Sequence, residues 1–100
     1  MEFSKRAAVP SCVLVSTMGE ESVLLNVETE VYFGLDAMGV RMWEVVTNSP
    51  SIEAAYGKLA DEFDVEPEVL RHQLTELLVQ LVQHGLLKVL PADVESIPAI

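Results

Sequence analysis

Residues 31–43, VYFGLDAMGVRMW, decide the fold of this 100-residue chain. The first five side chains of this stretch are uncharged and rich in aromatic and β-branched types, a composition typical of a short strand. Asp36 suits the N-cap of a helix, and the apolar residues after it recur at helical spacing up to the breaker at residues 47–50. The sequence therefore predicts a strand at Val31–Leu35 that leads directly into a helix.

Two more strands are predicted before this stretch. Apolar, β-favouring runs occupy residues 12–16 and 23–27, and the polar segment between them contains Gly19. This pattern is typical of a β-hairpin. Residues 1–10 show no periodicity and end at a proline, so we expect a loose lead-in there.

Three more elements are predicted after it: a helix at 51–63, a helix at 67–84 and a short strand at 86–90. Ser51 suits the N-cap of the first helix, Pro67 the first position of the second, and Gly85 the position just past its end. Two prolines within residues 91–100 favour a frayed tail. The predicted architecture is α+β, with three N-terminal antiparallel strands followed by three helices.

Composition limits the function classes that this fold can serve. The length is enough for a single domain, residues 1–100, in which we expect an ordered core of about 12–90. The net charge of −10 opposes binding to nucleic acid. The apolar runs are too short to cross a membrane, no signal segment opens the chain, and Cys12 has no second cysteine to pair with, so we expect a cytoplasmic protein.

The sequence contains no arrangement typical of an enzyme. Cys12 is the single cysteine, and His72 and His84 lie about 18 Å apart along one predicted helix, so these residues form no metal site. A glycine-rich phosphate loop and a nucleophile elbow are both absent. We therefore predict no catalytic residues, no metal ligands and no cofactor.

Two features leave the kind of binding open. The helices at 51–63 and 67–84 have the outline of a helix-turn-helix, although residues 66–84 offer Arg71 against three glutamates. The strand at Val31–Leu35 is either a central strand of the sheet or an edge that awaits a partner. A regulator of transcription therefore stays as the alternative to a peptide-binding protein.

The stretch at 31–43 also resembles the sequence pattern of the PqqD-like family. That pattern has tyrosine-phenylalanine, leucine-asparagine, two residues, a glycine, and a tryptophan four positions later. The matching residues are Tyr32, Phe33, Leu35, Asp36, Gly39 and Trp43, with aspartate in place of the commoner asparagine. The resemblance extends over about 12–88 through residues 51–55, Leu74, Leu77, Leu78, Leu81 and residues 85–87.

Members of this family are RiPP recognition elements, small winged-helix-like domains that bind the leader of a ribosomally made precursor peptide. The resemblance implies a non-catalytic protein that adds an extended leader to its third strand and delivers it to a separate processing enzyme, such as a leader protease or another tailoring enzyme. The chain is most similar to freestanding subunits of lasso-peptide biosynthesis. The alternatives are a pyrroloquinoline-quinone-type peptide chaperone and, from a different class, a winged-helix transcriptional regulator.

The resemblance also implies which residues contact the leader. Backbone groups of the third strand would pair with it, and Leu70 and Gln73 would form the rim of a groove. Leu74 and Leu77 would form a floor shared with the core. Gln73 stands where many members carry an aspartate, which leaves open any leader contact that needs a carboxylate there. The implied site is Val31, Tyr32, Phe33, Gly34, Leu35, Leu70, Gln73, Leu74 and Leu77.

Overall fold

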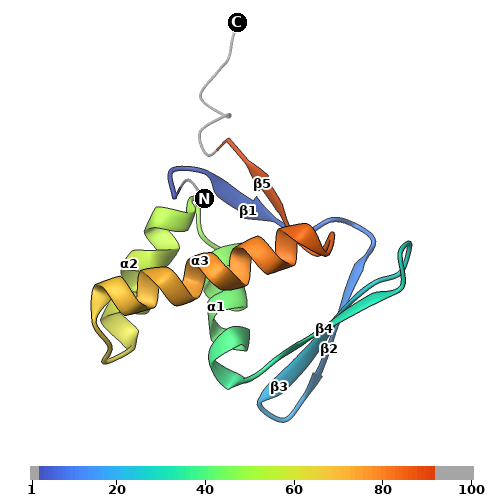
Figure 1. Cartoon of the computed structure of the whole chain (residues 1–100), viewed down its shortest axis with the longest axis horizontal. Helices are drawn as coiled ribbons and strands as arrows, with labels where there is room; N and C mark the ends of the chain where they lie inside the picture. The colour runs from blue at the N-terminus through green and yellow to red at the C-terminus, as the bar shows by residue number, and fades with distance from the viewer. Residues whose placement is uncertain (1–2, 92–100) are drawn as a thin grey trace, which may run out of the picture.

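The order of secondary structure follows the prediction, with one addition at the start. The computed structural model describes residues 3–91, and its elements are β1 (Arg6–Ala8), β2 (Val13–Met18), β3 (Glu21–Asn26), β4 (Val31–Leu35), α1 (Ala37–Thr47), α2 (Ile52–Glu62), α3 (Pro67–Gln83) and β5 (Lys88–Leu90). The predicted α+β arrangement, three antiparallel strands and then three helices, is confirmed by β2–β4 and α1–α3 (Figure 1). No helix in the described part is long and apolar enough to cross a membrane.

The three-stranded sheet has the order β2-β3-β4, and both neighbouring pairs are antiparallel. A two-residue turn with Gly19 at φ +64° joins β2 to β3, a conformation that glycine adopts without a steric penalty. In the register, Leu24 of β3 lies opposite Val15 on one side and Phe33 on the other. β4 is therefore an edge strand of this sheet.

The predicted loose lead-in at residues 1–10 is wrong for its described part. β1 lies in this segment and pairs antiparallel with β5, and both Phe3 and Ala7 are buried. The backbone of the same segment docks on the start of α2, where the Ile52 amide donates to the Lys5 carbonyl at 2.7 Å. A three-residue strand whose partner lies at the other end of the chain leaves no local periodicity, so the sequence could not indicate it.

The predicted C-terminal strand is confirmed in a shorter form. β5 occupies the last three residues of the predicted segment at 86–90, and Leu86 and Leu87 before it are buried. The predicted frayed tail, 91–100, lies outside the described residues except for Pro91.

Local signals placed the helix starts correctly. The Asp36 carboxylate accepts a hydrogen bond from the Gly39 amide (2.8 Å), and the Ser51 hydroxyl accepts one from the Ala54 amide (3.1 Å). Pro67 is the first residue of α3. The largest fully buried side chains of the core are Leu24, Val46, Ile52, Leu59, Leu70, Leu74, Leu78, Leu81 and Leu86.

Asn26 ties the sheet to the end of α3. Its buried amide nitrogen donates to the Gly85 carbonyl (2.8 Å), while its Oδ1 accepts hydrogen bonds from the Glu28 and Thr29 amides in the β3–β4 turn. Gly85 has φ +72°, and a Cβ there would lie 3.2 Å from the Asn26 Nδ2 atom. One side chain therefore shapes the turn and fixes where the β3–β4 hairpin lies against α3.

Replacing Asn26 by aspartate tests this tie, because Asn26→Asp keeps the acceptor for the turn and removes the donor to Gly85. We expect the free energy of unfolding to fall by about 1–3 kcal/mol, since a buried carbonyl loses its partner and faces a carboxylate. Urea denaturation measures the change.

The matched control is Asn48→Asp. Asn48 also donates from its side chain to a helix carbonyl (Glu44, 2.7 Å), but at an exposed position. We expect a loss below about 1 kcal/mol there. Equal losses in the two variants would contradict the structural role of Asn26.

Candidate functional site

β4 offers a free edge of the sheet. β3 pairs with one side of β4, and no other strand of residues 3–91 pairs with its second side. In an antiparallel pair, directly opposed residues alternate between exchanging two hydrogen bonds and exchanging none. The residues of β4 that do not bond β3 therefore turn their N–H and C=O groups toward the free edge.

One hydrogen bond fixes which residues these are. The Val27 amide donates to the Cys12 carbonyl (2.9 Å), so the residues of β3 that bond β2 are the odd-numbered ones. The even-numbered residues of β3 then bond β4, and their opposed residues are the odd-numbered ones of β4. Tyr32 and Gly34 are left with outward-facing backbone groups.

The side chains of β4 alternate between the two faces of the sheet. Leu35 is buried and Phe33 half-buried on the face that the helices cover, and the Phe33 ring meets the His84 ring edge-on, with centroids 5.6 Å apart. Tyr32, 69% exposed, and Gly34 lie on the other face. The C-terminal end of α3 therefore lies beside the helix-facing side of β4.

A pocket of about 240 Å³ lies on the helix side, where β4 runs into α1; we call it the inner pocket. It is lined by Asp36, Met38, Gly39, Met42, Gln73 and Leu77. The lining is mostly apolar, and the Asp36 carboxylate at its edge is already hydrogen-bonded to the Gly39 amide. The pocket can therefore take an apolar side chain and offers polar groups only at its rim.

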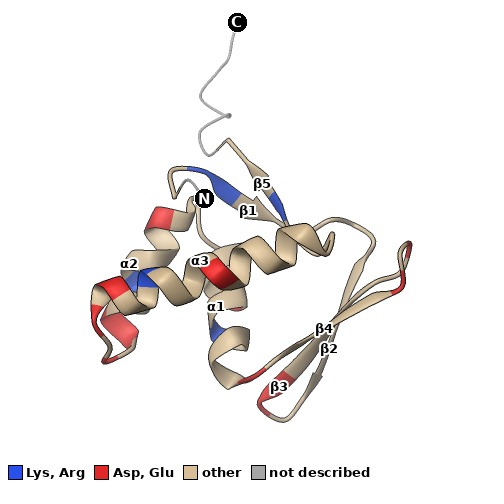
Figure 2. Ribbon diagram, in the orientation of Figure 1, with Lys and Arg blue, Asp and Glu red and all other residues tan. Residues whose placement is uncertain are grey.

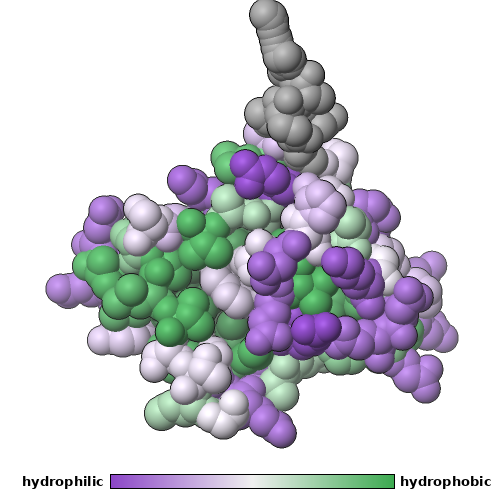
Figure 3. Space-filling model, turned by 180° about the vertical axis from the view of Figure 1, so that it is seen from behind, coloured by the Kyte–Doolittle hydropathy of each residue, from purple (hydrophilic) through white to green (hydrophobic). Residues whose placement is uncertain are grey.

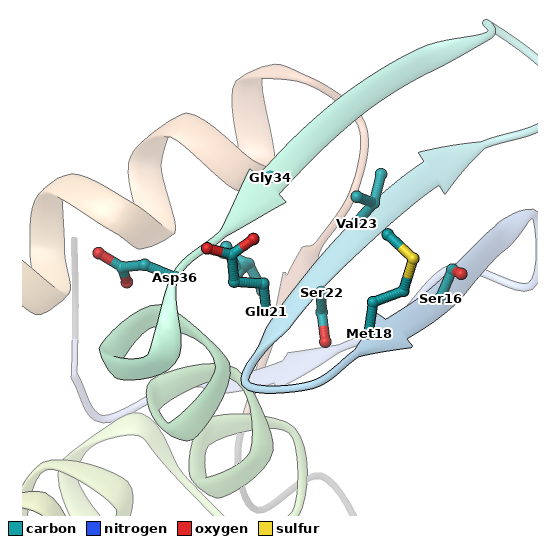
Figure 4. Close-up of a pocket in the computed structure, with 8 residues that line it drawn as sticks. Ser16, Met18, Glu21, Ser22, Val23, Gly34 and Asp36 are labelled. Carbon is teal, nitrogen blue, oxygen red and sulfur yellow. The ribbon is translucent and has the colours of Figure 1, made fainter.

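A second pocket, of about 230 Å³, lies on the opposite face of the sheet at the same end of β4; we call it the outer pocket (Figure 4). It is lined by Ser16, Met18, Glu21, Ser22, Val23, Gly34, Leu35 and Asp36. The surrounding face is apolar for an exposed surface, with Leu14 57% and Met18 72% exposed, and Figure 3 shows hydrophobic atoms gathered over this part of the molecule. Both faces of β4 therefore carry a hollow near its C-terminal end.

The structure brings some of the implied site residues together at the inner pocket and buries others in the core. Gln73 is exposed and Leu77 half-buried, and both line the inner pocket. Leu74 is fully buried in the core beneath them. Leu70 is also fully buried, so its expected rim position is wrong: it belongs to the stripe of α3 that packs into the core.

The sequence analysis missed the α1 side of the inner pocket. Met38 and Met42 are two of the apolar residues whose spacing predicted the first helix, and both line this pocket, Met42 from an almost fully buried position. Their spacing of four residues right after the helix cap was the available signal, because it puts both side chains on one face next to the end of the strand.

Two carboxylates line these pockets, Asp36 in both and Glu21 in the outer pocket, and the other acidic residues lie elsewhere. Figure 2 shows that many Asp and Glu positions of the ribbon lie at the α2–α3 turn and at the turns of the hairpins. Residues 3–91 contain no group of three side chains that could hold a metal ion. Hydrogen bonds from Arg41 lower the pKa of the Glu62 carboxyl, but this pair joins α1 to α2. The arrangement therefore suits recognition of an extended, largely apolar chain.

Comparison with known proteins agrees with this geometry. Residues 21–87 match the family model described as coenzyme PQQ synthesis protein D (PqqD). The chain is also similar to a solved structure, TbiB1 in complex with the TbiA(beta) leader peptide, at 29% sequence identity and a TM-score of 0.71. The similarity covers 81% of this chain and 94% of that one. No curated protein matches the chain.

The assigned backbone pattern of β4 predicts its hydrogen exchange. We expect the amides of Tyr32 and Gly34 to exchange at least about tenfold faster than the amide of Phe33 between them, because only Phe33 donates to β3. Amide exchange followed by NMR in the absence of any peptide measures this. Slow exchange at Tyr32 and Gly34 with fast exchange at Phe33 would show that the assigned alternation is inverted.

Proposed function

Because the chain belongs to the PqqD family, we propose that it binds the leader of a ribosomally made precursor peptide and has no catalytic activity of its own. The observation that carries this proposal is the free edge of β4, where Tyr32 and Gly34 turn their backbone groups outward next to an apolar pocket. The similarity of the chain to a protein whose structure contains a leader peptide supports the same conclusion.

The leader binds as an added antiparallel strand. Tyr32 and Gly34 together supply two donors and two acceptors, and each main-chain hydrogen bond contributes about 1 kcal/mol net. Such pairing accepts almost any sequence, so the preference for one leader comes from side chains that enter the pockets. We assign these contacts to Phe33, Gln73 and Leu77, with Leu74 beneath them.

The remaining implied residues do not contact the leader directly in this proposal. Val31 and Leu35 bond β3 through their backbones, so they shape the edge without pairing with the leader. Leu70 has no accessible surface to offer and is left out of the contact set.

A partner enzyme completes this function. A module that only holds the leader needs a separate enzyme to process the precursor. The sequence resemblance to freestanding subunits of lasso-peptide biosynthesis favours a leader protease over another tailoring enzyme. The alternative within the same class is a peptide chaperone of the pyrroloquinoline-quinone type. A cytoplasmic location belongs to this proposal, since the precursor is made there.

Charge argues against the winged-helix transcriptional regulator. Arg71, the single arginine of α3, lies over the Phe3 ring (4.0 Å from guanidinium carbon to centroid) and 3.9 Å from the Glu53 carboxylate. It is therefore engaged within the protein, on a chain of net charge −10. A surface of this kind repels phosphates instead of neutralising them.

The test is a titration with the cognate leader, a synthetic peptide copied from the precursor encoded beside the gene for this chain. We expect saturable binding by calorimetry and no binding of duplex DNA at low salt. Leu77→Glu should weaken leader binding by at least about tenfold, because it places a charge in the inner pocket.

The matched control is Val69→Glu, which adds the same charge to the same helix at a position that is 46% exposed and lines neither pocket. It should leave the affinity unchanged, and thermal melting should show both variants folded. DNA binding without leader binding would replace this proposal by the regulator. Equal effects of the two variants would remove the inner pocket from it.

A further inference from the structure

The fold itself does not require a glycine at Gly34. Its φ is not in the positive region, unlike that of Gly19 and Gly85, and a Cβ built on Gly34 meets no atom within 4 Å. A glycine inside a strand lowers the stability of the strand, and one with no conformational reason often marks a place where a ligand approaches closely. The missing side chain therefore leaves space for something outside the protein.

That space is the outer pocket. Gly34 forms its edge on β4, its opposed residue Val23 lies on β3, and Ser16 and Met18 line it from β2 (Figure 4). The lining surface is mostly apolar, with Val23 directly opposite Gly34 and Met18 on β2. Ser16 and Ser22 add hydroxyl groups, and the carboxylates of Glu21 and Asp36 stand at one end. A large apolar side chain fits this lining better than a charged or small polar one.

Strand addition decides what occupies the pocket, so the inference rests on the proposed function. A leader residue paired with Gly34 exchanges both hydrogen bonds with it, about 5.5 Å away between Cα atoms, and points its side chain to the same face of the sheet. We propose that the leader residue paired with Gly34 is large and apolar and that its side chain fills the outer pocket. The outer pocket is then a second specificity site, on the other face of the added strand from the inner pocket.

This placement determines which leader residues point toward the inner pocket and which toward the outer pocket. The residues on either side of the one paired with Gly34 point their side chains toward α3, and their amides point away from β4. The leader amides needed for pairing therefore belong to the residues opposite Tyr32 and Gly34, whose side chains lie on the outer face. Side chains that enter the inner pocket belong to the intervening residues, whose amides can be methylated with little loss.

Filling the outer pocket from the protein tests the proposal. Gly34→Val places a side chain in the space without strain, and a β-branched residue suits a strand. We expect the affinity for the cognate leader to fall by at least about tenfold while the melting temperature does not fall. Val23→Phe fills the same space from the central strand, leaves the β4 edge untouched, and should weaken binding in the same direction.

A set of leaders, each with one residue changed to alanine, identifies the occupant. One large apolar position should matter for the unchanged protein and lose its effect in Gly34→Val, and methylation of the backbone nitrogen at that position should also weaken binding. Gly57→Ala, an exposed helical glycine with open space around it, is the control and should bind every leader as the unchanged protein does.

The possible failures are distinguishable. If the leader protects the Tyr32 and Gly34 amides from exchange but binds Gly34→Val and Val23→Phe as tightly as the unchanged protein, the outer pocket has no role and strand addition stands. If the leader neither binds nor protects these amides, the proposed function fails first. If the same leader position loses affinity on change to alanine with both Gly34→Val and the unchanged protein, the side chain at that position does not fill the outer pocket. That result overturns the inference.

Discussion

An antiparallel sheet satisfies only alternate residues of its edge strand, and the candidate site depends on the half that it leaves unsatisfied. In β4 those residues are Tyr32 and Gly34, while the odd-numbered residues of the strand bond β3. An open row of amides is normally a hazard that proteins cover or twist away. In the proposed function the open row binds the leader, and the pockets beside it restrict which extended chain can pair with it.

The helices determine what the edge can select. Asn26 fixes the hairpin against the end of α3, and the Asp36 cap starts α1 at the exact point where β4 stops. The cap also supplies part of the inner pocket, because Asp36 and Gly39 both line it. The outer pocket has a different origin, because it exists where one strand residue has no side chain.

The sequence predicted the parts of this arrangement that have local causes. The bounds of β4 were predicted to the residue, because an apolar run with β-branched residues meets a helix cap at Asp36. The helix α3 was predicted from the spacing of its leucines and from Pro67 and Gly85 at its ends. Helical spacing places Leu70 on the same stripe as Leu74 and Leu78, so the rim position implied by the family resemblance ran against the local pattern. Tertiary placement had no such signal. Neither β1 nor the bonding phase of β4 could be obtained without knowing which strands pair.

The open edge also bears on how this protein behaves at high concentration. Two copies could pair their β4 strands about a two-fold axis, and the arrangement that bonds Tyr32 of each to Gly34 of the other places Glu30 opposite Asp36 at both ends. Like charges directly opposed across a strand pair destabilise it, and the net charge of −10 repels the copies before they meet. We therefore expect the acidic residues that bracket β4 to disfavour this pairing, an effect that weakens as added salt screens their charges.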